Sequence, residues 1–377
     1  MAGIPAVNKS LYQALQFNVG DPAALIRFVE AEGERRHLIV RDIEMGRARE
    51  QAAVDSVSCP ADFTPANGLS GDRETATAQS VAECLAREGV EHVTSDRTLP
   101  LSFVDELRAR NMEIVYDPEL GVLDRRQKTA AEIAALREAQ RDTESAIRMA
   151  CETIATSSPG TDGILQHDGD ALTSERIREM IDLHLLGMGY ETSPSIVAGG
   201  ACGGDCHERG TGPLRTGEPI IIDVFPRNKT SLYVGDCTRC VVHGEVPPTI
   251  MAMHAAIIEA KAAATAATRA GVTGEQVHEA TLGAIHSHGF ASGLPGEEDP
   301  ADRIAMTHGT GHGVGLDVHE PPLLDFGGPV LLEGDALTIE PGLYAPAIGG
   351  LRVEDMVIVT ASGAENLNTL PEGLTWS

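Results

Sequence analysis

Four acidic residues and one histidine in the second half of the chain could bind metal ions together: Asp223, Asp236, His312, Glu340 and Glu354. Carboxylate oxygens and an imidazole nitrogen suit Mn, Fe(II), Co or Zn better than an ion that prefers thiolates. Four carboxylates brought together would repel one another and take up protons unless cations neutralise them. Two divalent ions would cancel the four negative charges.

The first two carboxylates lie in a predicted β-hairpin. Apolar and β-branched runs over residues 220–225 and 233–242 flank a polar segment, which is the pattern of two strands joined by a turn. A turn centred at residues 229–230 would place Asp223 directly opposite Asp236. Opposite residues on one face hold their Cβ atoms roughly 4.5–5.5 Å apart, so the two carboxylates would face each other.

A second predicted hairpin repeats this arrangement between residues 335 and 360. A turn centred on Ala347 would place Glu340 opposite Glu354. Arg352 lies two residues before Glu354 and should share its face. It would either orient that carboxylate or balance its charge.

Two further residues flank Asp236 at strand spacing, Tyr233 and Thr238. Their hydroxyl groups could support the metal-binding carboxylates by hydrogen bonds. The alternative for both is ordinary packing in the sheet.

Three histidines lie in a glycine-rich segment, residues 308–320, which reads HGTGHGVGLDVHE. The four alternating glycines disfavour a helix, so an extended segment is predicted. At roughly 3.3 Å per residue, His308, His312 and His319 would span more than one coordination sphere. One of them is therefore expected to bind metal, and the other two would be free for acid–base or oxyanion chemistry.

These motifs together resemble those of the pita-bread metallopeptidase family, which contains methionine aminopeptidase, aminopeptidase P, prolidase and the metal-free creatinase. The resemblance rests on IIIDVFPR, GDCTR, HGTGHGVGLDVHE, TIEPGLY and LRVED, which occur in the family's order within residues 125–377. It implies an α+β catalytic domain, and the Xaa-Pro aminopeptidases are the members that the chain resembles most.

The resemblance implies a role for each of the five metal-binding candidates. Asp223 would chelate one ion, and Asp236 and Glu354 would bridge two. His312 and Glu340 would complete the other site. The implied cofactor is a pair of divalent ions, with Mn first and Co, Zn or Fe as alternatives.

Four residues are implied to act on the substrate rather than only on the metals. His207, His308 and His319 match histidines that contact the substrate or stabilise the tetrahedral intermediate. Glu340 would also move the proton when a hydroxide generated at the metals attacks the scissile carbonyl.

The implied activity is a dinuclear metallo-aminopeptidase that removes an N-terminal residue preceding proline. Prolidases often carry an arginine shortly after the HE pair to hold the carboxylate of a dipeptide, whereas this chain has Leu323 there. This difference favours the aminopeptidase over the first alternative, an Xaa-Pro dipeptidase (prolidase). The second alternative, a catalytically inactive pita-bread binding module, is disfavoured because all five metal-binding candidates are present.

Composition excludes several other classes of protein. With 377 residues and 42% hydrophobic content, the chain is long enough for two domains with buried cores. Its net charge of −27 argues against binding to nucleic acid or anionic membranes. No apolar run approaches the ~18 residues of a membrane span.

The cysteines and the N-terminus favour a cytoplasmic protein. The chain has seven cysteines, an odd number, and its first residues lack an apolar segment of signal-peptide length. Cys202 and Cys206 with Cys237 and Cys240 superficially resemble a four-thiolate zinc site. The last two should point to opposite faces of a strand, which is poor geometry for shared ligation.

The remaining elements must position these residues. Residues 1–124 alternate short apolar runs with helical stretches, which predicts an N-terminal α/β domain of the creatinase type. In the family, such a domain helps to close the site of its own or a neighbouring subunit, so a homodimer or higher homo-oligomer is expected. The boundary should fall near residues 125–129.

The catalytic domain, residues 125–377, is predicted to contain two helix–helix–hairpin units related by a pseudo-twofold axis. The first pair of helices should begin at a Thr129/Glu132 capping box and at Thr173, and the second pair after Pro248 and at Thr273. Each pair precedes one acidic hairpin, so the metals would lie at the centre of the duplication.

Overall fold

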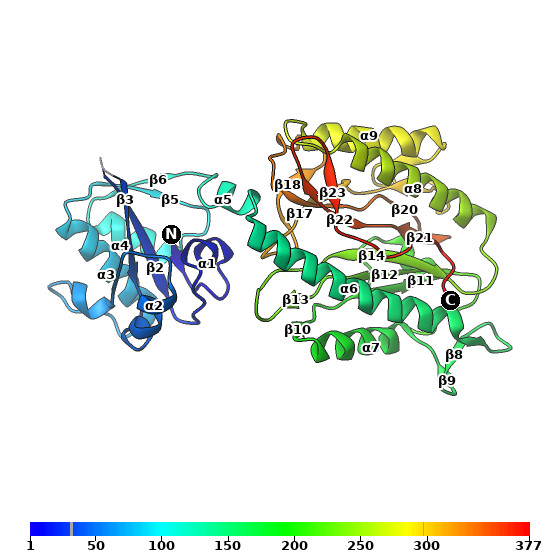
Figure 1. Ribbon diagram of the computed structural model, residues 1–377, viewed down its shortest axis with the longest axis horizontal. Coiled ribbons are helices and arrows are strands. Elements are labelled where there is room, and N and C mark those ends of the chain that lie inside the picture. The colour runs from blue at the N-terminus through cyan, green and yellow to red at the C-terminus, as the bar shows by residue number, and fades with distance from the viewer. Residues whose placement is uncertain (31–32, 297) are drawn as a thin grey trace. The chain divides into compact units, whose positions relative to one another are not determined.

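The computed structural model describes residues 1–30, 33–296 and 298–377, which divide into two compact units, residues 1–125 and 126–377 (Figure 1). The first unit contains β1 (Ala2–Gly3), α1 (Lys9–Leu15), β2 (Ala23–Glu30), β3 (Gly33–Ile39), η1 (Asp42–Glu44), α2 (Met45–Gln51), β4 (Ser56–Ser58), η2 (Pro60–Phe63), α3 (Arg73–Arg87), β5 (His92–Ser95), α4 (Leu101–Ala109) and β6 (Glu113–Tyr116).

This first unit mixes helices with two sheets. One sheet has the order β1-β2-β3-β4, in which β3 and β4 are parallel, and β5 pairs with β6 in parallel. The helix α3 starts where Asp72 accepts the backbone N–H of Thr75, and its buried face packs with Phe103 and Leu107 of α4. The alternation of helices and strands predicted from the sequence is confirmed here.

The second unit contains the metal-binding candidates. Its helices are α5 (Leu123–Arg126, which crosses the division), α6 (Ala130–Thr156), α7 (Ser174–Gly187), η3 (Gly200–Gly204), α8 (Pro248–Ala267) and α9 (Gly274–Ser287). The predicted capping boxes at Thr129 and Thr273 are confirmed, and Thr173 caps α7.

The strands of this unit are short and mostly antiparallel. They are β7 (Ser158–Pro159), β8 (Leu165–His167), β9 (Asp170–Ala171), β10 (Tyr190–Glu191), β11 (Ile196–Gly199), β12 (Pro219–Val224), β13 (Arg227–Asn228), β14 (Cys237–Val242), β15 (Ala291–Ser292), β16 (Ala305–Met306), β17 (Gly311–Gly313), β18 (Glu320–Leu324), β19 (Ala336–Ile339), β20 (Gly342–Ala345), β21 (Gly349–Arg352), β22 (Asp355–Val359) and β23 (Ala364–Asn366). The three larger sheets have the orders β11-β12-β14, β15-β16-β20-β21 and β18-β17-β19-β22-β23.

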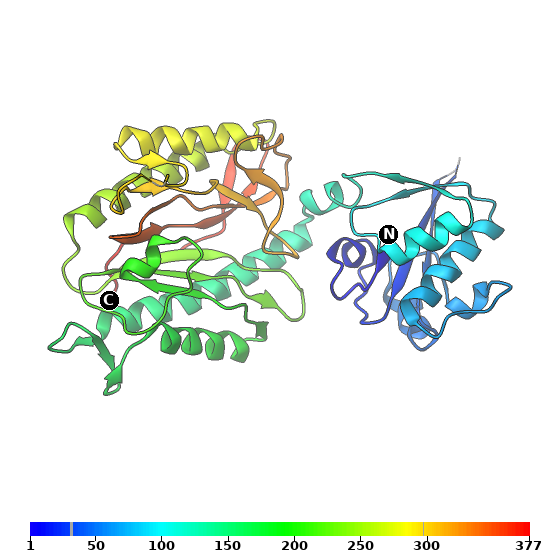
Figure 2. The ribbon, with the colours of Figure 1, turned by 180° about the vertical axis from the view of Figure 1, so that it is seen from behind.

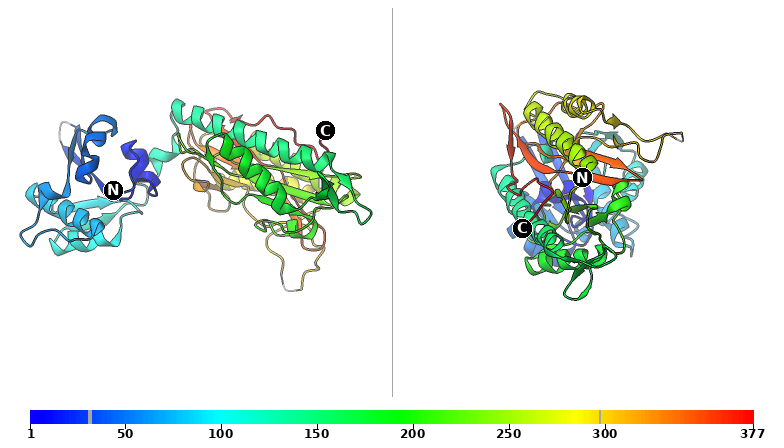
Figure 3. Two further views of the ribbon diagram at one scale, coloured as in Figure 1. Left: turned by 90° about the horizontal axis from the view of Figure 1, so that it is seen from below. Right: turned by 90° about the vertical axis from the view of Figure 1, so that its right-hand side faces the viewer.

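Two pairs of helices enclose the strands. In Figure 1, α8 and α9 lie along one side of the sheets and α6 and α7 along the other, and Figure 2 shows the same layers from behind. The left view of Figure 3 shows α6 and α7 side by side across the strands. Four of the five candidate ligands, Asp223, Asp236, His312 and Glu354, are buried in this unit.

A separate apolar core lies beneath each pair of helices. Residues such as Ile147 of α6 and Ile222 of β12 belong to one core, and Ile257 of α8 and Leu351 of β21 belong to the other. Burying this many aliphatic side chains supplies the main driving force for the arrangement.

The strand β14 contributes to both cores. Cys237 lies in the core beneath α6, and Cys240 lies in the core beneath α8. The two cysteines therefore point to opposite faces, as predicted. In the described ranges, no group of residues able to hold a metal includes either of them.

The helix α8 is mostly apolar, although His254, Glu259 and Lys261 interrupt its apolar residues. Within the described part of the chain, it is the one helix that is long and apolar enough to cross a membrane by length and composition alone. Its residues Met253 and Ile257 are buried in the core, and its Lys261 forms an ion pair with Asp355. Packing inside the unit thus accounts for its apolar composition.

The first acidic hairpin lies very close to α6 at Gly235. A Cβ atom at this position would lie 2.1 Å from Thr143 Oγ1 and 2.6 Å from the carbonyl oxygen of Ala139. Real Cβ atoms do not approach other atoms so closely, so only glycine allows this contact. The residue next to Gly235 is Asp236, and the contact therefore helps to place that carboxylate.

We expect Gly235→Ala to lower the free energy of unfolding of the metal-free protein by about 1–3 kcal/mol, because the added methyl group overpacks the contact with α6. Urea denaturation would measure this change. Gly283→Ala is the matched control, since Gly283 lies in α9 with no atom within 4 Å of a built Cβ. The control should gain about 0.5–1 kcal/mol. Unchanged stability in Gly235→Ala would contradict the packing argument.

Candidate metal centre

The first hairpin places Asp223 and Asp236 on one face, but not opposite each other. Asp223 pairs with Thr238, and Asp236 directly precedes β14. The prediction that the two carboxylates are cross-strand partners is therefore wrong. Its register is off by two residues, and because side chains alternate with a period of two, the carboxylates still share a face.

The turn of this hairpin explains the shift. A bridge between Arg227 and Val234 continues the register of the strands, which centres the turn one residue later than predicted. The side-chain oxygen of Asn228 accepts the backbone N–H groups of Thr230 and Ser231, and Leu232 adopts a positive φ of 65°. This local chemistry, which is typical of an Asx turn, decides the register.

The second hairpin places Glu340 and Glu354 as predicted. Gly342 pairs with Arg352 on one side of them, and Ile339 pairs with Asp355 on the other. Both pairings have the same register, centred on Ala347, so Glu340 and Glu354 lie opposite each other where two sheets meet. That prediction is confirmed.

The histidine segment folds back on itself instead of staying extended. The strand β17 pairs with β18 through a bulge after His312, which faces Leu323 across the pair. His319 returns beside His312, with the ring centroids 4.4 Å apart. The prediction that the histidines are widely separated along an extended segment is therefore wrong for these two.

Glycines make the position of β17 possible. A Cβ at Gly311 would lie 2.0 Å from the carbonyl oxygen of Thr338, and one at Gly313 would lie 2.4 Å from that of Pro321. The neighbouring strands thus touch the backbone of β17 on this face. His312 points to the opposite face, where it lines a cavity.

All five candidate ligands line this one cavity, whose volume is about 510 Å³. One ligand atom each from Asp236, His312 and Glu354 lie within 4.8 Å of one another. His312 Nε2 is 3.3 Å from Glu340 Oε1 and 3.8 Å from Asp236 Oδ2. The tertiary structure brings together residues that are more than a hundred positions apart in the sequence.

Hydrogen bonding indicates which nitrogen of His312 could bind a metal. Its Nδ1 lies 3.0 Å from the carbonyl oxygen of Gly313, which can only accept, so Nδ1 carries the proton. Burial lowers the pKa of His312, which keeps the ring neutral. The lone pair of Nε2 therefore faces the carboxylates of Asp236 and Glu340. Because the nitrogen and the carboxylate oxygens are all acceptors, a proton or a cation must lie between them.

Burial disfavours the ionised form of these carboxyl groups when no metal is bound. It raises the pKa of Asp236 well above its usual value, and the neighbouring Glu354 raises it further. Burial likewise raises the pKa of Glu354 and of Glu340. A cation in the cavity would reverse this effect, because it favours the ionised form of each group.

The hydrogen bonding of Asp223 indicates whether the candidate ligands fit a metal ion. Its Oδ1 is buried and has no hydrogen-bond partner among the described residues, whereas its Oδ2 accepts from Arg352 Nη2 at 2.6 Å. An unpartnered buried carboxylate oxygen is costly, and a metal ion would satisfy it. With four carboxylates and one neutral imidazole around the cavity, the donor set fits divalent ions.

Arg352 orients Asp223 rather than Glu354. It reaches Glu354 only through Thr238, whose Oγ1 accepts from Arg352 Nε at 3.1 Å and donates to Glu354 Oε2 at 2.7 Å. The predicted supporting role of Thr238 agrees with this geometry. Of the two roles predicted for Arg352, orienting Glu354 or balancing its charge, any orientation of Glu354 acts through this Thr238 hydroxyl group, which links both hairpins.

Tyr233 does not support the metal ligands. Its hydroxyl group donates to Glu132 Oε1 of α6 at 2.5 Å, and it does not line the cavity. The residue lies three positions before Asp236, and an odd spacing along a strand places two side chains on opposite faces. The predicted contact with Asp236 is therefore wrong.

The three substrate-side histidines differ in what their nitrogens contact. His308 Nδ1 lies 2.7 Å from the carbonyl oxygen of Gly309, and its Nε2 lies 2.8 Å from the hydroxyl group of Tyr344. Both nitrogens are thus engaged. His319 and His207 are exposed at the cavity, and in the described ranges neither ring nitrogen of either residue has a hydrogen-bond partner. These two are better placed to meet a substrate.

Three supporting residues were not predicted. Tyr344 accepts from Arg352 Nη1 at 2.9 Å, and Gln140 of α6 exchanges two hydrogen bonds with the backbone of Asp236 (2.7 and 2.8 Å). Arg239 Nη1 donates to the carbonyl oxygen of Glu354 at 2.5 Å. Strand alternation could have indicated Tyr344, since it lies four residues after Glu340. No local signal identifies the other two.

Metal should stabilise the protein more as the pH rises. Carboxyl groups whose pKa is raised in the folded state favour the fold only while protonated. Their contribution is present below the unfolded pKa of about 4 and is lost as the pH rises through the raised folded value. A bound ion removes that loss, and its affinity grows as the carboxyl groups release their protons.

We therefore expect the increase in Tm on adding Mn to metal-free protein to be small near pH 5 and several degrees larger near pH 8. Differential scanning calorimetry with and without Mn would measure it. The double variant Asp236→Asn with Glu354→Gln should show little increase at either pH. An increase that is equal at both pH values in the unaltered protein would count against these carboxylates as ligands.

Comparison with known proteins agrees with this geometry. The sequence profile described as Metallopeptidase family M24 matches residues 134–361. The chain is 36% identical to "Probable dipeptidase PepE" of Mycobacterium tuberculosis over 181 residues, which is 48% of this chain and 45% of that protein. It is 26% identical to "Xaa-Pro dipeptidase" of Pyrococcus horikoshii over 289 residues, which is 75% of this chain and 74% of that protein.

Solved structures share the fold over nearly the whole chain. An Xaa-Pro dipeptidase from Bacillus anthracis superposes with a TM-score of 0.79 and 24% identity, covering 98% of this chain and 93% of that one. An X-Pro aminopeptidase from Thermotoga maritima superposes with a TM-score of 0.78 and 21% identity, covering 100% and 96%. The match to PepE spans less than half of that protein's length.

Proposed function

Because the chain belongs to metallopeptidase family M24, we propose that it is a dinuclear metal-dependent peptidase that removes the N-terminal residue from peptides with proline in the second position. The observation that carries this proposal is the buried, unpartnered Oδ1 of Asp223 in a cavity lined by the other four ligand candidates. The resemblance to the pita-bread metallopeptidases, expected from the sequence motifs, is confirmed. The peptidases of this family are metal-dependent.

The five candidate ligands would be distributed between the two ions as the family resemblance implies. Asp223 would chelate one ion, His312 and Glu340 the other, and Asp236 and Glu354 would lie between them. Divalent ions held there supply Lewis-acid activation of water and of the scissile carbonyl. Mn remains our first expectation, with Co, Zn or Fe as alternatives, because this donor set accepts all four.

Glu340 is the residue that we propose moves the proton. It is half-buried, burial raises its pKa above the ordinary range of a glutamate, and it lines the cavity beside His312. His319 is the residue that we propose stabilises the oxyanion. Burial lowers its pKa, so the neutral ring offers one N–H group to the developing charge.

The other two histidines have separate proposed roles. His308 is held by Tyr344 and Gly309 through both nitrogens and would form the wall of the cavity rather than donate to the substrate. His207 lies at the cavity with its ring exposed and would contact the substrate directly.

The cavity wall favours the aminopeptidase over the dipeptidase. Among the described residues that line it, Arg352 is the sole permanent cation, and that guanidinium is buried against Asp223. Leu323 lies three residues after the HE pair, and its side chain is exposed at the cavity. A dipeptide substrate would present its carboxylate close to this apolar side chain, whereas a longer peptide would present a neutral peptide bond.

The Xaa-Pro dipeptidase remains the second candidate, because several relatives of this chain carry that name. Further expectations from the sequence stay predictions: a cytoplasmic location, a homodimer or higher homo-oligomer, peptide substrates, and no binding to nucleic acid or membranes. An inactive binding module is the third candidate. Metal analysis that found no transition metal, with no activation by added Mn or Co, would favour it.

A comparison of Xaa-Pro-Yaa tripeptides with Xaa-Pro dipeptides tests the proposed substrate class. We expect the Mn-loaded protein to have a kcat/KM at least about tenfold higher for the tripeptide, because the described residues lining the cavity offer a dipeptide's carboxylate no Arg or Lys side chain besides the buried Arg352. Leu323→Arg is the informative variant, and it should raise dipeptide cleavage. A higher kcat/KM for dipeptides in the unaltered protein would support the dipeptidase instead.

Loss of His319 should slow catalysis without removing metal. We expect His319→Ala to lower kcat by about 10²–10³-fold, the usual effect of losing one oxyanion donor, with unchanged metal content by elemental analysis. His286→Ala is the control, because His286 is exposed on α9 and bonds only Ser292 among the described residues. If His319→Ala emptied the metal centre, the residue would be a ligand and its proposed role would be wrong.

A further inference from the structure

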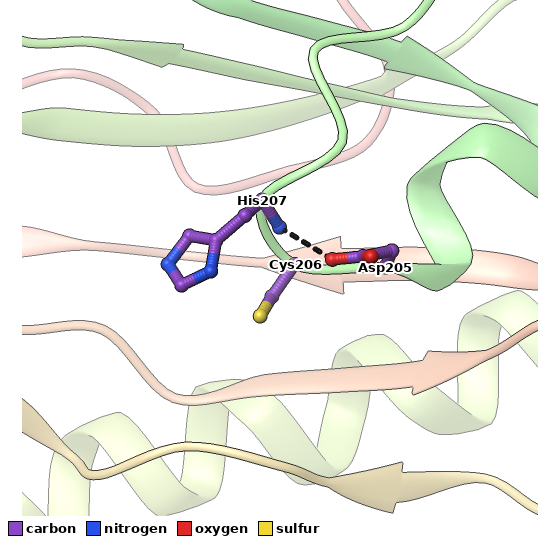
Figure 4. Close-up of side chains that lie close together, drawn as sticks. All are labelled: Asp205, Cys206 and His207. Carbon is purple, nitrogen blue, oxygen red and sulfur yellow. Dashed lines mark hydrogen bonds between the residues drawn. The ribbon is translucent and has the colours of Figure 1, made fainter.

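Three consecutive residues outside the five-ligand centre place metal-binding atoms together: Asp205, Cys206 and His207. A carboxylate oxygen, the Sγ atom and an imidazole nitrogen from these residues lie within 4.8 Å of one another. Figure 4 shows the three side chains on one turn, where the backbone N–H of His207 donates to Asp205 Oδ1 at 2.9 Å. Asp205 and His207 are exposed and Cys206 is half-buried, so an ion could reach them from solvent.

The chemistry of this cluster differs from that of the five-ligand centre. A thiolate and an imidazole select soft or borderline ions such as Zn²⁺ and Cd²⁺, whereas four carboxylates also accept Mn²⁺. Zn–S and Zn–N bonds of about 2.3 and 2.0 Å put neighbouring ligand atoms roughly 3.5 Å apart. Since the ligand atoms lie within 4.8 Å of one another, rotation of the exposed Asp205 and His207 side chains can bring them to this spacing.

We propose that Asp205, Cys206 and His207 form a third metal site, which binds Zn²⁺ or Cd²⁺ and inhibits the enzyme. On binding, the S–H bond of Cys206 breaks, its proton passes to solvent, and a sulfur–metal bond forms. His207 contributes a ring nitrogen and Asp205 a carboxylate oxygen. Water would complete a tetrahedral shell.

The position of the cluster explains why binding would inhibit. Cys206 and His207 line the same cavity as Glu340 and His319. An ion that holds a nitrogen of His207 removes that nitrogen from the substrate and adds positive charge at the cavity wall. This consequence rests on the proposed function of the cavity, whereas metal binding itself does not.

The cluster also touches the residue that orients Asp223. The carbonyl oxygen of Cys206 accepts from Arg352 Nη1 at 3.2 Å, and Arg352 Nη2 donates to Asp223 Oδ2. The third site is therefore linked to the five-ligand centre by backbone as well as by the shared cavity.

The test is a Cd²⁺ titration of the full-length, Mn-loaded protein with two readouts. The ultraviolet thiolate-to-cadmium charge-transfer band reports binding and needs no peptide, while hydrolysis of an Xaa-Pro-Yaa peptide reports inhibition. We expect one cadmium–thiolate site per chain, and inhibition that follows the same titration curve. The five-ligand centre contains no thiolate, so Cd²⁺ exchange there adds nothing to the band.

Two serine variants identify the site. Cys206→Ser should abolish the band and raise the half-inhibitory Cd²⁺ concentration by at least about tenfold, the lower bound seen when even a supporting residue of a metal site is lost. Cys202→Ser is the matched control, because Cys202 is also half-buried and lies four residues earlier in η3. It should keep both the band and the inhibition. Each variant's inhibition is expressed relative to its own rate without Cd²⁺.

The outcomes separate this proposal from the peptidase proposal. A band that persists in Cys206→Ser, or that disappears in Cys202→Ser, would overturn the site. A band at Cys206 without any loss of hydrolysis would overturn the inhibitory role. If no peptide is hydrolysed, the peptidase proposal fails, but the band still decides whether the third site exists. Cys206→Ala and circular dichroism would confirm that loss of the band does not reflect unfolding.

Discussion

Three buried carboxylates and the half-buried Glu340 surround one neutral imidazole, and this arrangement carries an electrostatic cost that the protein alone offsets only in part. Arg352 neutralises Asp223, and burial keeps the pKa of Asp236, Glu340 and Glu354 raised. The remaining charge requires protons or cations, and divalent ions remove the cost most completely. The same cluster of carboxylates therefore enables the site to bind metal ions and makes it electrostatically unfavourable without them.

The structure around the site holds these groups close in spite of their repulsion. Gln140 fixes the backbone of Asp236 from α6, and Arg239 fixes that of Glu354 from β14. Thr238 connects the hairpins by bonding both Arg352 and Glu354. The ligands thus lie on elements that are covered by two pairs of helices, which is the rigidity that a preorganised metal site needs.

The histidines at the cavity differ in which of their ring nitrogens are hydrogen-bonded. His312 presents a lone pair to the carboxylates, and His308 is held by Gly309 and Tyr344. His319 and His207 are exposed at the cavity. The roles proposed for these residues follow from which nitrogen is engaged, a property that residue type alone does not reveal. The thiol beside His207 adds a softer ligand at the cavity wall, and the third site proposed there depends on that proximity.

The sequence by itself determined what has a local physical cause. Capping residues such as Thr129 and Thr273 set the starts of helices, and the symmetry of the second hairpin about Ala347 set Glu340 opposite Glu354. The period of two along a strand kept Asp223 and Asp236 on one face even though the predicted register was wrong. These features depend on neighbouring residues, so spacing and residue type were sufficient.

Only the tertiary structure decided the features that depend on distant contacts. The Asx turn at Asn228 shifted the first hairpin, and the return of the chain after His312 brought His319 beside it. The bond from Arg352 to Asp223 and the support from Gln140 join residues more than ninety positions apart. No periodicity links such residues, because their proximity is produced by the packing of the helices and sheets, and their hydrogen-bond partners are chosen by that packing.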